Sequence, residues 1–302
     1  MTYFCRITLF CGIIAGLASC ATVYNYRLGA GLHAHDLIYQ PKPMASRDSG
    51  LNTATYVGGV VLWGNGYKEG LKGGQTEDQH RLGLLQFNRA HSWNAATLSY
   101  GTFGYLGQYT ISPNSFSKYD TSTVGGIRQV NRLPSAYAGT YNFYGFGFRG
   151  SAQLNAILGK NTNWRFIGVD MVYSREYGEL SRLRQIIPQQ SVPNGLGSYS
   201  NGKDNWYIAR QPSLFTIAAT TEMVFSSDPA RDRSFSLKYS IGTSSHPYDN
   251  SQWFTIRSFV AAYQYRQHIA SLTFGNELRK PATHLSYHYR LDYKQKKKAN
   301  RY

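Results

Sequence analysis

The sequence of 302 residues predicts an all-β protein, an antiparallel up-and-down β-barrel of about ten strands. Three observations predict this fold class. The chain contains 25 tyrosines, 15 phenylalanines and 30 glycines, as expected of strands that are apolar on one face only. Apolar and polar residues alternate with a period of two in segment after segment. The connections between these segments are alternately short and long, as in a barrel whose two rims differ.

The chain begins with a short apolar run. Residues 7–16 follow the lone charge of Arg6 and lead to Leu-Ala-Ser-Cys at positions 17–20. This run is far too short to cross a bilayer as a helix, so we interpret residues 1–19 as a secretory signal peptide. Cys20 is then the first residue of the mature chain. The alternative to a signal that specifies Cys20 is an ordinary signal peptide that ends near this cysteine by coincidence.

Residues 20–51 are expected to form an extended tether that lies beneath or inside the barrel. His33 and His35 alternate along this segment and lack a third ligand nearby, so we expect no metal site. Cys5 and Cys11 leave with the signal peptide, and a single cysteine remains. A single thiol forms neither an internal disulfide nor a cysteine-based zinc site.

Ten segments that follow the tether have strand character. In residues 235–241 the apolar set is Phe, Leu, Tyr and Ile, and the interleaved set is Ser, Lys and Ser. A helix would instead space its apolar residues three and four apart. The barrel domain is therefore expected over residues 52–293, with strands at 53–63, 80–90, 95–106, 141–158, 164–178, 215–225, 235–241, 253–266, 268–275 and 284–293.

The links between these segments sort by length. Tight links follow the even-numbered strands, at 91–94, 159–163, 226–232 and around Gln267. Longer links follow odd-numbered strands, at 64–79, 107–140, 179–213 and 242–252. An even strand count leaves both ends of the barrel at the short-turn rim, where Cys20 is then expected. Four tryptophans fall at strand ends, as in an interfacial aromatic girdle: Trp63, Trp93, Trp164 and Trp253.

With these features the chain resembles a small outer-membrane β-barrel lipoprotein of the Gram-negative envelope. Residues 17–20 match the lipobox of such proteins, and the alternating strands run from about residue 53 to Tyr293. The resemblance implies acylation of Cys20, a barrel of outer-membrane type and insertion in the outer membrane, with no cofactor and no particular chemistry. The basic tail at 294–302 is a departure, because such barrels usually end on the aromatic residue of the last strand.

The formal net charge is +16, which becomes +15 when the signal peptide is removed with Arg6. Nucleic acid, anionic lipid and acidic protein are the candidate partners of a positive surface. Nucleic acid is not expected for an exported lipoprotein, whereas lipopolysaccharide phosphates surround an outer-membrane rim. Basic residues of the long links are expected to meet them, namely Arg182, Arg184, Lys203 and Arg210. The alternative is that these are solvated loop charges.

The last predicted strand carries the residues closest to a catalytic pattern. Its polar face presents His284, Ser286, His288, Arg290 and Asp292. A serine hydrolase needs a nucleophile, an imidazole and an orienting carboxylate. The pair His284 and Ser286 resembles outer-membrane lipid A deacylases, but Tyr287 stands where these enzymes have asparagine, and an orienting glutamate is missing. We therefore interpret the polar face as filling of the barrel lumen and expect no catalytic residue.

The strand count also limits the function. Open aqueous channels appear at about sixteen strands, so a lumen of about ten strands is expected to be largely plugged. The links at 107–140 and 179–213 are rich in residues typical of recognition surfaces. We expect a non-catalytic barrel that binds ligands or scaffolds other envelope proteins. The alternatives are a lipid hydrolase that uses His284 and Ser286, and a periplasmic β-domain tethered by its lipid.

Overall fold

The computed structural model describes residues 26–32, 36–45, 50–68, 75–112, 122–124, 127–129, 137–159, 161–187, 206–227, 233–245, 254–277 and 280–292. Cys20, His33, His35, Lys203, Trp253 and the tail at 294–302 lie outside these residues, so the structure does not test the predictions made for them.

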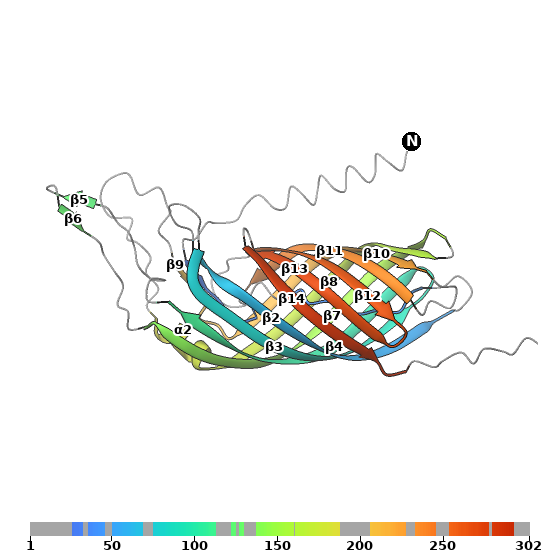
Figure 1. Cartoon of the computed structure of the whole chain (residues 1–302), viewed down its shortest axis with the longest axis horizontal. Helices are drawn as coiled ribbons and strands as arrows, with labels where there is room; N and C mark the ends of the chain where they lie inside the picture. Colours follow the sequence, from blue (N-terminus) through green and yellow to red (C-terminus); the bar gives the residue numbers. More distant parts are fainter. Residues whose placement is uncertain are drawn as a thin grey trace, which may run out of the picture.

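Ten long antiparallel strands form one closed ring (Figure 1). Each strand pairs with its neighbours in chain order, and β14 pairs with β2 to close the barrel. The predicted up-and-down barrel is therefore confirmed, and each predicted segment coincides with one strand. The ring consists of β2 (Asn52–Lys68), β3 (Gln75–Ser92), β4 (Ala96–Ile111), β7 (Gly139–Ile157), β8 (Thr162–Gly178), β10 (Ser213–Ser226), β11 (Arg233–Ser245), β12 (Phe254–Tyr265), β13 (His268–Glu277) and β14 (Lys280–Arg290).

The two rims of the barrel differ in part as predicted, because two links of one rim are far longer than any link of the other. We call the rim with the links 93–95, 158–161, 227–232 and 266–267 the short-turn rim, and the opposite one the long-loop rim. Two links of the long-loop rim are as short as those of the short-turn rim. The link after β2 covers only residues 69–74, because β2 and β3 continue to pair as far as Tyr67 and Gln75. The link between β13 and β14 is residues 278–279, because these strands pair out to Glu277 and Lys280.

The strand faces follow the period-two alternation. Ser236, Lys238 and Ser240 of β11 are buried inside the barrel, whereas Phe235 and Tyr239 are each 41% exposed on the outside. Large apolar side chains also point outward from the other strands, while the inward faces carry polar residues together with an apolar cluster toward the long-loop rim. This is the distribution of a barrel that faces lipid. Outward residues include Val57, Val61, Leu85, Phe87, Leu106, Phe146, Phe148, Leu154, Met171, Phe259, Phe274 and Leu285.

Smaller elements gather at the long-loop rim, at the left end of the barrel in Figure 1. The short strands β5 (Ser122–Val124) and β6 (Ile127–Gln129) pair with each other. Strand β1 (Tyr26–Leu28) pairs antiparallel with the last residues of β2 and in parallel with β9 (Trp206–Ile208). This rim therefore carries the chain that precedes the barrel as well as the long links.

A helix, α2 (Glu179–Ile186), begins where the sequence analysis expected a loop. Leu180 and Leu183 are buried three residues apart and pack with Ile187 into the apolar cluster at the long-loop end of the barrel. This spacing places Leu180 and Leu183 on one face of the helix, and Ile187 follows directly after its last residue. Within the described ranges, no helix has both the length and the apolar character needed to cross a bilayer.

Candidate functional site

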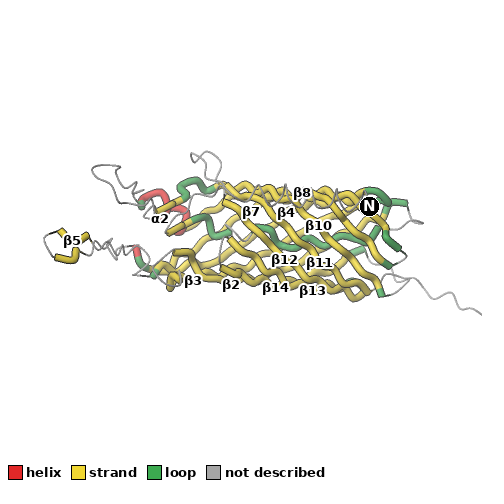
Figure 2. The backbone as a smooth tube through the Cα atoms, turned by 90° about the horizontal axis from the view of Figure 1, so that it is seen from above, coloured by secondary structure: helices red, strands yellow, loops and turns green. Residues whose placement is uncertain are grey.

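The segment of residues 36–45 lies inside the barrel, where Figure 2 shows a loop running between the strands. Every residue of this segment is buried. We call residues 28–32 and 36–45 together the internal segment. The sequence left two positions open for this segment, beneath the barrel or inside it. The structure shows residues 36–45 inside.

Strand β3 shows how the internal segment runs. Gln86 Nε2 donates to the carbonyl of Tyr39 (3.1 Å), Asn88 Nδ2 to that of Pro41 (3.2 Å), and Ser92 Oγ to that of Pro43 (2.7 Å). Residues two apart on a strand face the same side, so the inward face of β3 binds alternate carbonyls. The segment therefore runs in the direction of β3, from the long-loop rim to the short-turn rim.

These bonds satisfy a backbone that has no sheet partner. Buried carbonyl and amide groups need hydrogen-bond partners, and lumen side chains supply them here. Arg149 adds a bond to the carbonyl of Ile38 (3.4 Å) while it donates to Gln86 Oε1 (2.8 Å) and lies over the ring of Phe103. Ser99 Oγ donates to Gln40 Oε1 (3.1 Å). The lumen is thus complementary to an extended peptide.

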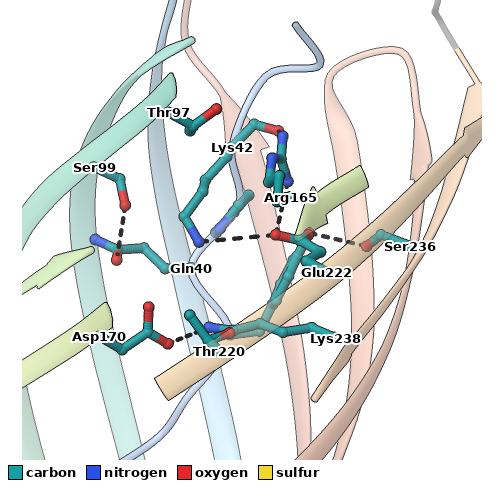
Figure 3. A network of polar contacts seen from close by, with 12 residues as sticks. Gln40, Lys42, Thr97, Ser99, Arg165, Asp170, Thr220, Glu222, Ser236 and Lys238 are labelled. Carbon is teal, nitrogen blue, oxygen red and sulfur yellow. Dashed lines mark hydrogen bonds and ion pairs between the residues drawn. The ribbon is translucent and has the colours of Figure 1, made fainter. Parts of the chain in front are cut away.

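Buried charges fix the segment near the short-turn rim (Figure 3). Glu222 lies 2.7 Å from Arg165 and 3.9 Å from Lys42 of the internal segment. Arg165 also donates to the carbonyl of Pro43 (2.8 Å). A second ion pair joins Lys238 to Asp170 on the wall of the barrel. A buried charge is costly unless it is paired or hydrogen-bonded, so this network favours one arrangement of the wall and the segment.

At the long-loop rim, an apolar cluster caps the lumen. It joins the start of the internal segment to α2, β9 and the strand ends, and its buried members include Leu28, Leu32, Leu180, Leu183, Ile187 and Ile208. Below it, Arg184 Nη2 pairs with Glu176 Oε1 (2.7 Å), and Glu176 also accepts the amide N–H of Gly31. Arg184 further donates to the carbonyls of Ala209 and Gln211. One ion pair therefore joins the internal segment, β8, α2 and the chain after β9.

The predicted polar face of the last strand is only partly in the lumen. His284, Ser286 and His288 are buried there. The prediction that Arg290 and Asp292 fill the lumen is wrong. They pair with each other at the short-turn rim (3.0 Å), and their side chains are partly exposed. Strand β14 ends at Arg290, so these two residues lie where inward and outward faces are no longer separated.

The serine of this face contacts a different histidine from the one considered in the sequence analysis. Ser286 Oγ lies 3.0 Å from His288 Nε2 and also bonds to Ser271 Oγ. The other ring nitrogen of His288 lies 3.2 Å from the amide nitrogen of Gln86, where a hydrolase would place a carboxylate. Tyr39 of the internal segment packs edge-on against His288. The arrangement is that of a packed polar core.

The loop arginines divide into two groups. Arg184 is fully buried in its ion pair with Glu176, so the expectation that it meets lipid phosphates is wrong. The reason is that Arg184 lies on the buried face of α2, which the sequence analysis treated as a loop. Arg182 and Arg210 are exposed.

The predicted tryptophan girdle can be examined at three positions. Trp63 is 50% exposed on the long-loop half of β2, and Trp93 is 40% exposed in a short turn. Trp164 is half-buried at the short-turn end of β8, and its Nε1 donates to Thr221 Oγ1 (3.0 Å). Trp63 and Trp93 thus lie toward opposite rims, as a girdle at each interface requires.

Sequence reasoning missed the residues that bind the internal segment. The period-two alternation does indicate that these residues point inward, but it does not indicate what they bind. They are Gln86, Asn88, Arg165 and Glu222. Their partners lie 47 to 183 residues away along the chain, so no local pattern connects them. Within the described ranges, no group of three or more His, Cys, Asp or Glu residues has a geometry that could hold a metal ion.

No family model matches the chain, and no curated protein matches it. Solved structures with similar folds include the β domain of the Bordetella autotransporter BrkA, with 10% identity, a TM-score of 0.40, and coverage of 78% of this chain and 98% of that one. The NanC porin has 10% identity and a TM-score of 0.32, with 79% and 100% of the two chains covered. An outer-membrane channel from Pseudomonas putida F1 has 11% identity and a TM-score of 0.33, with 82% and 100% covered.

Proposed function

We propose that this protein is an outer-membrane β-barrel lipoprotein, acylated at Cys20, that acts without catalysis as a binding or scaffold component of the Gram-negative envelope. The apolar outer face supports the membrane location. On β3 the outward residues from Gly83 to Phe87 carry no charge, and Arg81 and Arg89 flank them. At a strand rise of about 3.3 Å and a tilt of about 40°, these arginines are roughly 20 Å apart along the barrel axis, close to the apolar band of such barrels.

The observation that carries the proposal is the occupied lumen. The internal segment contacts the wall from Gly31 near the long-loop rim to Pro43 near the short-turn rim. A lumen filled by the protein's own chain offers no open aqueous path, so general diffusion through it is not the function. The rims remain as the surfaces on which binding can occur. The long-loop rim carries the additional elements α2, β9 and the paired strands β5 and β6.

Anionic lipid is the proposed small partner of this rim. Arg81 and Arg175 are exposed on the long-loop half of the barrel wall, and Arg182 is exposed on α2. Arginine binds phosphate through a planar fork of donors, which suits the phosphates of lipopolysaccharide. Other envelope proteins are the proposed macromolecular partners.

The gel mobility of the protein from isolated outer membranes tests its location and its barrel fold. The unboiled protein should migrate as a compact species, and boiling in detergent should shift it. A Cys20→Ser variant, exported by an ordinary cleavable signal peptide, should remain in the membrane and keep the shift. Release of this variant as a soluble protein would instead establish the lipid-tethered periplasmic domain. Labelling with a fatty-acid analogue should mark the wild type and not the variant.

Partner retention tests the scaffold role. After cross-linking in intact cells, the wild type should retain a defined envelope protein, and a variant in which a short glycine turn replaces residues 113–136 should lose it. A matched variant with substitutions in the short turn at 93–95 should keep it. Equal retention by both variants would argue against recognition at the long-loop rim.

The lipid-hydrolase alternative has less support, because His288, the histidine that contacts Ser286, lies between the Gln86 amide and the ring of Tyr39. We expect the purified protein to release no fatty acid from lipopolysaccharide, and Ser286→Ala and His284→Ala to leave the heat-dependent shift intact. Fatty-acid release that Ser286→Ala abolishes in a folded barrel would establish the hydrolase.

A further inference from the structure

We propose that the amino terminus of the mature chain, and with it the acyl group on Cys20, lies on the long-loop side of the membrane, and that the internal segment connects it to the barrel through the lumen. The sequence predicts this end at the short-turn rim, because an even strand count leaves both ends of the barrel there. The position of the anchor rests on the proposed acylation of Cys20, but the path of the chain does not.

The internal segment leaves the lumen at the long-loop rim. Tyr26 and Arg27 of β1 pair with Lys68 and Tyr67, the last residues of β2, at the long-loop rim. The next strand contact is β9, which belongs to a long-loop link and pairs in parallel with β1. The amide of Ala209 also donates to the carbonyl of Leu28 (2.9 Å). Backbone bonds from two elements of this rim therefore hold the chain where it emerges.

The chain between Cys20 and β1 is too short to reach from one rim to the other. An extended chain covers at most about 3.6 Å per residue, so the six residues from Cys20 to Tyr26 span at most about 22 Å. Strand β2 has 17 residues, which at a rise of about 3.3 Å and a tilt of about 40° separates the rims by roughly 40 Å. A chain held at Tyr26 cannot bring Cys20 back to the short-turn rim.

The closed ring also constrains the order of assembly. The ring is closed by β14 and β2, whose register runs from Thr283 and Trp63 to Arg290 and Tyr56. The lumen is packed around the internal segment by buried side chains, so an acylated terminus has no room to pass through the finished barrel. The order that the geometry requires is that the internal segment lies against the inner faces of the strands before β14 and β2 pair.

Epitope accessibility tests the proposal in the full-length protein. The same short epitope is inserted in three separate variants, between Val23 and Tyr24, between Gly195 and Leu196 in a long link, and between Asn94 and Ala95 in a short turn. Each variant must show the heat-dependent gel shift of a folded barrel. Antibody binding is then measured on intact cells and on cells with permeabilised outer membranes.

We expect the epitope at Val23 to behave like the one at Gly195, with binding in intact cells, and the one at Asn94 to require permeabilisation. If the Val23 epitope behaves like the Asn94 epitope, the proposal is wrong. Incorporation of the fatty-acid analogue is read in the same cells. Its absence would remove the acyl anchor from the proposed function, while the epitopes would still report the side on which the terminus lies.

Discussion

At the residue scale, the molecule depends on buried charges that are matched across the lumen. Glu222 sits between Arg165 of the wall and Lys42 of the internal segment, and its Oε1 also lies 3.4 Å from the hydroxyl of Tyr39. Removal of one partner from a buried ion pair is more damaging than the net contribution of the pair, because the remaining charge is left without compensation. Glu222 is therefore the side chain whose charge matters most to the fit between segment and wall.

We predict that Glu222→Gln lowers the free energy of unfolding by about 3 to 5 kcal/mol, because Arg165 and Lys42 then stay buried without a counter-charge. Urea unfolding in lipid vesicles, followed by tryptophan fluorescence, measures this change. The matched control is Asp292→Asn, which makes the same chemical change in the partly exposed pair with Arg290 and should cost at most about 1 kcal/mol. Equal effects of the two variants would contradict the role assigned to Glu222.

At the element scale, the internal segment takes the place of the side chains that fill smaller barrels. Eight strands enclose a space that side chains alone can fill, and ten strands enclose more. The additional space is occupied by one extended peptide, whose carbonyls bind Gln86, Asn88, Ser92 and Arg165. The segment thus acts as a core element of the barrel, and the same contacts close the lumen.

We predict that deletion of residues 21–49, which joins Cys20 directly to Gly50, converts the closed barrel into a conducting one. The deletion removes the peptide that fills the lumen and leaves the ten strands and their seam unchanged. Planar-bilayer recordings should show stepwise conductance for the variant and none for the wild type. The gel shift on boiling serves as the control for a folded barrel, and a folded variant that stays closed would contradict the prediction.

At the scale of the whole molecule, the outer face determines how the barrel sits in lipid. Leu85 is 72% exposed and lies midway along β3 between the outward Arg81 and Arg89. This position corresponds to the middle of the apolar band, where a charge is most unfavourable. Gln79 is exposed on the same face of the same strand, two residues beyond Arg81 toward the long-loop rim. The two positions differ mainly in depth.

We predict that Leu85→Arg destabilises the inserted barrel by about 2 to 4 kcal/mol, whereas Gln79→Arg costs at most about 1 kcal/mol. Reversible unfolding from lipid vesicles gives both values against the wild type. The expected difference arises because arginine at mid-depth loses its hydration, while arginine near the rim keeps its charge in water. Equal costs would show that the outward face of β3 does not cross the apolar part of the membrane.

The sequence alone predicts the barrel, its strand number, the alternation of strand faces and the two longest links. These features depend on period-two alternation and on turn spacing, which are local properties of the chain. The predicted lumen position of Ser286 is therefore confirmed. Helix α2 was missed because its apolar spacing covers only a few residues.

The path of residues 26–32 and 36–45, the pairing of Glu222 with Lys42 and Arg165, and the burial of Arg184 against Glu176 are seen only in the tertiary structure. An extended segment without regular hydrogen bonds has no periodicity to read. Its carbonyls become satisfied only when strands far apart in the chain enclose it, so its position is a property of the closed ring. The physical reason is that the free energy of burying a backbone depends on the groups that surround it, and the closed barrel brings those groups together.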